Sequence, residues 1–167
     1  LMFITLPFLS LIPVISSADW TQFSHNETHQ GYTNETVDAY RLRWITDLDP
    51  ENNSSFYTSP VIYKDKVIVT NGHSLYVLDF ETGNILWNNS KNDTILEEPA
   101  VAEDIIVVGS WKDTYAFSID GRELWNLSIR STLPTICEGK VYLSGTSGLY
   151  CVNIKNGEII WHIPGGG

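Results

Sequence analysis

The sequence predicts an all-β protein, a β-propeller built of four-stranded antiparallel blades. The first indication is a repeat. Pro60, Pro99 and Pro134 each lie in a strand-like run that is followed, at nearly the same distance, by a glycine-containing turn and a tryptophan. Self-similarity at a period of this size is the signature of a repeat architecture. In addition, several strand-like runs are apolar on both faces, and no helical pattern follows residue 18.

The first repeat contains four short runs of strand-forming residues. The run at 66–70, for example, is Lys-Val-Ile-Val-Thr, which is rich in β-branched residues. Such runs, separated by short polar turns, predict an antiparallel meander. The expected strands of this repeat cover 59–63, 66–70, 74–79 and 84–88.

The second and third repeats follow the same plan. Asp120-Gly121 and Asn156-Gly157 precede the last strand of each, and these dipeptides are strong hairpin signals because both positions can take positive φ. The expected strands cover 98–102, 105–109, 113–118 and 122–126, and then 133–137, 140–144, 148–153 and 158–163.

The packing of these sheets follows from strands that are apolar on both sides. The run Ile-Ile-Val-Val at 105–108 requires a sheet that is covered on both faces. Radial stacking of four-stranded sheets around an axis achieves this, and that arrangement is a propeller. We expect blades at about 58–89, 98–127 and 133–164.

The segment 77–87, Val-Leu-Asp-Phe-Glu-Thr-Gly-Asn-Ile-Leu-Trp, resembles the tryptophan-docking motif of pyrroloquinoline-quinone (PQQ)-like propeller repeats, with Val77 in place of the usual alanine. The segments that end at Trp125 and Trp161 match the motif more loosely. The opening 19–23, Asp-Trp-Thr-Gln-Phe, also resembles the first segment of this family. The resemblance covers about residues 19–164, and its motif is far more specific for fold than for function.

The resemblance implies that each of these tryptophans covers the adjacent blade and hydrogen-bonds to it, while the turn before it is held by polar residues and glycine. A large flat ring with one N–H donor suits this role, and a platform for stacking a carbohydrate or quinone is the alternative. Trp44, at the end of an alternating run, is expected to mark the outer strand of a further blade. The predicted docking residues are Trp87, Trp125, Trp161, Asp79, Thr82, Gly83, Gly121 and Gly157.

Three blades are fewer than the roughly four to eight of known propellers. In this family the N-terminal strand often completes the last blade. We therefore expect the chain to be the N-terminal part of a longer protein. The alternative is that several short chains associate into one ring.

Residues 1–18 stand apart from the repeats. Leu1 to Ile15 is almost entirely apolar and uncharged, and Ser16-Ser17-Ala18 supplies the small residues that signal peptidase accepts. The segment is predicted to be a signal peptide cleaved after Ala18, with an uncleaved membrane anchor as the alternative. In either case we expect the propeller at 19–164 to be exported to the cell surface, the extracellular space or the periplasm, with membrane contact only through this segment.

The net charge limits the partners that we expect, and the glycosylation sequons agree with export. Ten basic and twenty acidic residues give a net charge of −10, which disfavours binding to nucleic acid and to anionic membrane surfaces. Asn-x-Ser/Thr sequons are frequent, which fits export and predicts a glycosylated exterior. The candidate glycosylation sites are Asn26, Asn34, Asn52, Asn53, Asn88, Asn92 and Asn126.

The two cysteines are predicted to be free, buried thiols. Cys137 and Cys151 fall on the first and third strands of one expected sheet. Two strand spacings of about 4.8 Å separate such positions, which is more than the roughly 7 Å between Cα atoms that a disulfide spans.

No residue pattern indicates catalysis, a metal site or a cofactor. His25 and His29 lie among loop-forming residues, where a solvated loop is favoured over a metal site. We expect a non-catalytic module that binds or scaffolds protein partners or ligands at the cell envelope. The alternative is the N-terminal part of a PQQ-dependent dehydrogenase, which would need PQQ and Ca²⁺. The sequence has no adjacent cysteines of the kind common in such enzymes, and no residue can be matched to their metal ligands or base.

Overall fold

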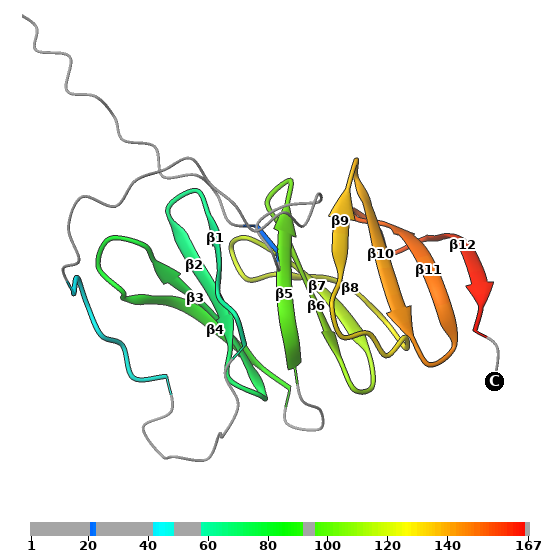
Figure 1. Cartoon of the computed structure of the whole chain (residues 1–167). Coiled ribbons are helices and arrows are strands. Elements are labelled where there is room, and N and C mark those ends of the chain that lie inside the picture. The colour runs from blue at the N-terminus through cyan, green and yellow to red at the C-terminus, as the bar shows by residue number, and fades with distance from the viewer. Residues whose placement is uncertain (1–20, 23–41, 49–57, 92–95, 166–167) are drawn as a thin grey trace, which may run out of the picture.

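The computed structural model describes residues 21–22, 42–48, 58–91 and 96–165. These residues form three antiparallel sheets of four strands each. The sheets stand side by side in chain order, from the green one at the left of Figure 1 to the orange and red one at the right. The predicted class, a partial propeller with four-stranded blades, is confirmed. The predicted signal peptide lies outside the described residues.

Each blade is a simple meander in which consecutive strands pair. All of the predicted strands are found, with ends that differ by no more than two residues. The first blade consists of β1 (Val61–Tyr63), β2 (Lys66–Thr70), β3 (Ser74–Asp79) and β4 (Ile85–Ser90). The second consists of β5 (Leu96–Ala102), β6 (Ile105–Ser110), β7 (Thr114–Ser118) and β8 (Glu123–Leu127). The third consists of β9 (Thr135–Cys137), β10 (Lys140–Gly145), β11 (Gly148–Asn153) and β12 (Ile159–Pro164).

Strand β6 shows why the blades stack. All of its residues are buried, and its side chains alternate between two apolar clusters, as strand geometry requires. Ile106 and Val108 face the first blade, where they share a cluster with Ile68 of that blade and Phe117 of their own. Ile105 and Val107 pack toward the third blade. The central blade thus contributes one face to each interblade core.

A β-bulge recurs at the same place in all three blades. The pairing of the third and fourth strands shifts directly after the residue that faces the predicted docking tryptophan. The facing residues are Val77, Ala116 and Cys151. A bulge bends a strand and re-aims its side chains, so this irregularity sets the direction of each tryptophan. The sequence analysis did not identify it.

The hairpin turns differ from the expectation in one respect. Gly121 and Gly157 have positive φ, but the preceding Asp120 and Asn156 do not. Consecutive positive φ values occur instead in the turns between the first and second strands, at Glu103-Asp104 and Glu138-Gly139. The turns before the fourth strand are wider than a two-residue hairpin, since the N–H of Ser118 donates to the carbonyl of Arg122 and the N–H of Asn153 to the carbonyl of Glu158, each at 2.8 Å.

The cysteines are free, as predicted. Cys137 lies in β9 and Cys151 in β11, with β10 between them. Cys151 is fully buried. The expectation of burial was wrong for Cys137, which is only partly buried. It ends its strand next to the turn at Glu138-Gly139, where the sheet meets solvent.

The short segment Thr21–Gln22 lies against the innermost strands of the second and third blades. The carbonyl of Thr21 accepts a hydrogen bond from the N–H of Val101 in β5, at 2.8 Å. The side-chain oxygen of Gln22 accepts one from the N–H of Ile136 in β9, at 3.0 Å. The segment, blue in Figure 1, therefore links two blades on their axial side. No helix within the described ranges is long and apolar enough to cross a membrane.

We expect Gln22→Ala to lower the free energy of unfolding by about 1–3 kcal/mol, because the buried N–H of Ile136 would lose its acceptor. Urea denaturation would measure the change. Glu158→Ala, which truncates an exposed side chain, is the control and should change stability by less than about 0.5 kcal/mol. Equal effects of the two variants would contradict the bridging role of Gln22.

Candidate functional site

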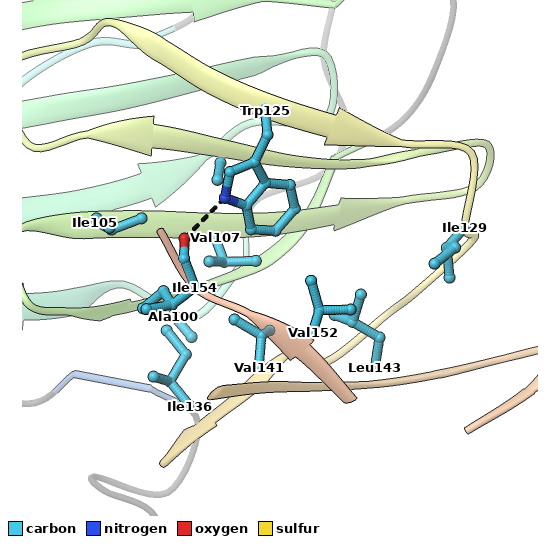
Figure 2. Close-up of a cluster of buried hydrophobic side chains, with 11 residues drawn as sticks. Ala100, Ile105, Val107, Trp125, Ile129, Ile136, Val141, Leu143, Val152 and Ile154 are labelled. Atoms are coloured by element: carbon cyan, nitrogen blue, oxygen red, sulfur yellow. Dashed lines mark hydrogen bonds between the residues drawn. The ribbon is translucent and has the colours of Figure 1, made fainter. Parts of the chain in front are cut away.

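The predicted docking tryptophans form hydrogen bonds between neighbouring blades. Trp87 Nε1 donates to the carbonyl of Ile119 in the second blade, at 2.9 Å. Trp125 Nε1 donates to the carbonyl of Ile154 in the third blade, at 2.7 Å. Figure 2 shows Trp125 above the cluster of buried side chains that joins these two blades. The indole thus closes an apolar interface and satisfies a backbone acceptor at its edge.

Trp44 makes the same contact from a segment that precedes the first blade. Its Nε1 donates to the carbonyl of Phe80, at 3.0 Å, and the hydroxyl of Thr46 donates to the carbonyl of Gly83, at 2.6 Å. Residues 42–47 pair with no strand in the described part of the chain. The segment nevertheless occupies, on the first blade, the position that an outer strand with a docking tryptophan takes on the second and third.

Each docked ring lies on a glycine. A Cβ atom at Gly121 would lie 2.9 Å from Trp87 Cδ2, and one at Gly157 would lie 2.9 Å from Trp125 Cγ. Gly83 is covered in the same way by Trp44. Any side chain at these positions would push the ring away, and the positive φ there also favours glycine.

The polar residues before the glycine hold the turn. Asp79 Oδ1 accepts hydrogen bonds from the N–H of Thr82, at 2.8 Å, and from its hydroxyl, at 2.7 Å. The N–H of Gly83 donates to the carbonyl of Asp79, at 2.9 Å. These bonds fix the loop that presents Gly83 to Trp44. In the corresponding turns, Ser118 and Asn153 accept backbone hydrogen bonds with their side chains instead.

Trp161, the third predicted docking residue, has no neighbouring blade within the described residues. It lies in β12 and is 39% exposed. Its ring contacts Tyr142 of the same blade, with centroids 6.1 Å apart. Isoleucines on the same strand, including Ile159 and Ile163, are also exposed.

Ion pairs add further links between neighbouring blades and the segment before them. Three of these pairs are exposed, so each of them contributes only about 0–1 kcal/mol, whereas Lys91–Glu123 is partly buried. The pairs are Arg43–Glu81, Lys64–Asp104, Lys91–Glu123 and Lys155–Glu103, with N–O distances of 2.7, 2.6, 2.7 and 3.3 Å.

A pocket of ≈ 340 Å³ lies between the second and third blades. One wall is the connection from β8 to β9, and the other is the end of β10 with the turn that follows it. The connection crosses the second blade, where the N–H of Ser131 donates to the carbonyl of Ser110 at 3.3 Å. Gly109 of the second blade and Gly145 of the third let the connection pass close to both blades. A Cβ at Gly109 would collide with the backbone of Ser131, and a Cβ at Gly145 with the backbone of Arg130. The lining residues are Arg130, Ser131, Thr132, Ser144, Gly145 and Thr146.

An exposed aromatic and a cation stand beside this pocket. Trp111 is 57% exposed, and the guanidinium of Arg130 lies 5.6 Å from the centroid of its ring. The indole N–H of Trp111 donates to Glu97 Oε1, at 2.6 Å, which fixes the ring. Arg130 forms no ion pair with any carboxylate in the described ranges. The rim therefore offers a cation in an otherwise acidic protein.

Ser131 gives the pocket an unusual polar atom. Its side chain is fully buried, and its Oγ has no hydrogen-bond partner among the described residues. The accessible hydroxyls of the wall are those of Thr132, Ser144 and Thr146, which are exposed and can donate and accept hydrogen bonds. Arginine, hydroxyls and an exposed tryptophan suit the binding of a polar or anionic group on another molecule. The sequence analysis missed this site, because its residues come from separate turns.

The other candidates are distributed as follows. His25 and His29 lie outside the described residues. Within the described part of the chain, no group of three or more His, Cys, Asp or Glu side chains could hold a metal ion. Among the candidate glycosylation sites, Asn88 and Asn126 are described and exposed. Asn26, Asn34, Asn52, Asn53 and Asn92 lie outside the described residues.

Comparison with known proteins establishes the family. A family model described as outer membrane protein assembly factor BamB (PQQ_2) matches residues 37–166. The chain belongs to this family of PQQ-like propeller repeats. The protein described as outer membrane protein assembly factor BamB from Shewanella oneidensis is 32% identical, over 52% of this chain and 25% of that protein. The chain thus spans about a quarter of the length of this relative.

Solved structures share the fold. A quinohemoprotein alcohol dehydrogenase from Pseudomonas putida HK5 matches with a TM-score of 0.70 and 16% identity, over 88% of this chain and 26% of that one. The computationally designed protein Ika4 matches with a TM-score of 0.61 and 19% identity, over 70% of this chain and 77% of that one. At these identities the similarity shows the propeller fold alone.

Replacing Trp125 by alanine should lower the free energy of unfolding by about 3–5 kcal/mol, because it empties a buried site between two blades. Denaturant melts would measure the loss. Trp111→Ala is a matched control, since this tryptophan is exposed and docks on no blade, and should cost less than about 1 kcal/mol. A loss for Trp125→Ala as small as that for Trp111→Ala would contradict the docking role.

The turn at Asp79 predicts an acid-dependent stability. The hydroxyl and then the backbone N–H of Thr82 donate to this carboxylate and hold the pKa of Asp79 below its ordinary value. A carboxylate whose folded-state pKa is depressed stabilises the fold above its unfolded pKa, about 4, and this contribution is lost as the pH falls through the folded value.

We therefore expect Asp79→Ala to lower Tm at neutral pH, with the difference from wild type shrinking as the pH falls below about 4. Thermal melts across this range would measure it. Asp120→Ala removes a carboxylate from the equivalent turn of the second blade and should change Tm less at neutral pH. A difference for Asp79→Ala that stays constant from neutral to strongly acidic pH would contradict the assignment.

Proposed function

We propose that the chain acts as a non-catalytic β-propeller module that binds a protein partner at the cell envelope. The contact surface is the pocket between the second and third blades, together with its rim of Trp111 and Arg130. The observation that carries this proposal is that a rigid polar pocket lies beside an exposed, fixed tryptophan and an arginine without an ion-pair partner in the described ranges. Tryptophan and arginine are enriched where proteins bind one another.

The family supports a role in protein assembly. The matching family model and the Shewanella oneidensis relative both bear the description outer membrane protein assembly factor. Export is supported by the apolar segment at 1–18 and by the many sequons. The charge of −10 supports a partner other than nucleic acid.

The pocket also suggests what the partner presents. Arg130 can bind a carboxylate through two parallel hydrogen bonds, and the hydroxyls of Thr132 and Thr146 can complete the contact. An acidic or carbonyl-rich loop on the partner would fit this wall. Such a loop would also cover the exposed part of Trp111.

The alternative function, PQQ-dependent oxidation, requires a Ca²⁺ site and a quinone platform. Within the described residues, no group of three or more His, Cys, Asp or Glu side chains could hold the metal. The tryptophans at 44, 87 and 125 are engaged in blade contacts, each donating its indole N–H to a backbone carbonyl and lying on a glycine.

Photo-crosslinking in the cell envelope would test the proposed surface. A photoreactive amino acid in place of Thr132 should give one discrete crosslinked product, and Arg130→Glu should reduce its yield by about tenfold or more, as expected for losing a charge-assisted contact of about 1.5–3 kcal/mol. Arg122→Glu is the matched control, because this exposed arginine lies at the opposite end of the second blade, and should leave the yield unchanged.

The same photoreactive group at Asp120 reports on the other end of that blade. Partner capture at Asp120 but not at Thr132, or equal yields with and without Arg130→Glu, would contradict the proposed surface. Dye reduction that depends on added PQQ and Ca²⁺ would overturn the non-catalytic assignment.

A further inference from the structure

Two of the sequons occupy the same structural position in neighbouring blades. Asn88 directly follows the docking residue Trp87 in β4, and Asn126 directly follows Trp125 in β8. Both face a tyrosine on the adjacent strand, Tyr76 for Asn88 and Tyr115 for Asn126. In the third blade the same position holds a histidine, His162, which stacks on Tyr150 with ring centroids 4.0 Å apart.

These two asparagines are accessible in the folded protein. Both side chains are exposed, and both strands lie at the edge of their sheets, with a paired strand on one side only. Asn126 stays exposed even though the neighbouring blades on both sides are present. Side chains alternate along a strand, so each asparagine points away from the face on which its tryptophan docks. Asn126 therefore lies on the side of Tyr115 and the first blade, where its side-chain amide donates to Glu123 Oε1 at 3.5 Å. Because Asn126 is exposed there, a glycan on it leaves the contact of Trp125 with the third blade intact.

We infer that Asn88 and Asn126 are N-glycosylated in the exported protein. In the reaction, the side-chain amide nitrogen attacks the anomeric carbon of a sugar carried on a lipid-linked phosphate. The new N–C bond forms as the C–O bond to the phosphate breaks, the lipid phosphate leaves, and the transferase removes one amide proton. Ser90 and Ser128 supply the hydroxyl that the sequon requires.

The geometry gives these glycans a physical consequence. The outer edges of β4 and β8 carry unpaired backbone groups, which favour strand-to-strand association between molecules. A glycan on each edge strand blocks that approach. The pocket lined by Arg130 and Thr132 belongs to the connection after β8 and to the third blade, not to these outer edges. Modification here would therefore direct partners toward the pocket.

The inference rests on the proposed envelope location, and one experiment separates the two. The protein is purified from envelope and cytosolic fractions of its native host, and peptides that contain Asn88 or Asn126 are analysed by mass spectrometry before and after chemical deglycosylation. We expect both peptides from the envelope fraction to carry a glycan, and the peptide that contains His162 to carry none.

Sequon variants identify the attachment sites. Ser90→Ala and Ser128→Ala should each remove one glycan mass from the intact protein, whereas the matched controls Ser90→Thr and Ser128→Thr, which keep the sequon, should retain it. Exported protein with both asparagines unmodified would overturn this inference alone. Unmodified protein found only in the cytosol would overturn the envelope location and the inference together.

Discussion

The first blade is joined to the second, and the second to the third, by a tryptophan that donates its indole N–H to a backbone carbonyl and covers a glycine turn. Burial of a side chain that takes about 150–250 Å² from water is worth about 4–6 kcal/mol, and the hydrogen bond adds about 1 kcal/mol. A single four-stranded sheet has two apolar faces and could not remain folded alone in water. The interface under Trp125 shows how the next blade removes one of these faces from solvent.

Because of this docking, the two ends of each blade differ in role: the turns at one end pack on the neighbouring blade, and those at the other end do not. The turn with Gly157, on which Trp125 docks, is fixed by contact with the neighbouring blade. The opposite end carries the connection through Arg130 and the turn at Trp111, which the docking does not need. Binding groups there are held by a rigid frame but take no part in the docking. This division is how one fold can carry unrelated functions.

The sequence predicted the strands well because each one has a strong local signal. The β-branched run at 66–70 and the Asp-Gly pair at 120–121 indicate strand and turn without knowledge of the rest. The bulges opposite Trp87 and Trp125 had no such signal, because they arise from pairing between strands. The pocket was missed because its lining residues come from separate turns that only the fold brings together.

Gly109 and Gly145 look like ordinary turn glycines in the sequence. Only the crossing of Ser131 over the second blade shows that they make room for a connection. The partial exposure of Cys137 likewise depends on where its strand ends relative to solvent, not on its residue type. The features that depend on one segment lying beside another were therefore the ones that local patterns could not supply.

The most direct test of the account is native-state hydrogen exchange of the indole N–H groups, followed by NMR. If docking joins the blades, the N–H of Trp125 should exchange only when the blades separate, and so at least about a hundred times more slowly than that of the exposed Trp111. Trp87, which donates to Ile119, should be protected in the same way. Exchange of Trp125 as fast as that of Trp111 would contradict the docked arrangement.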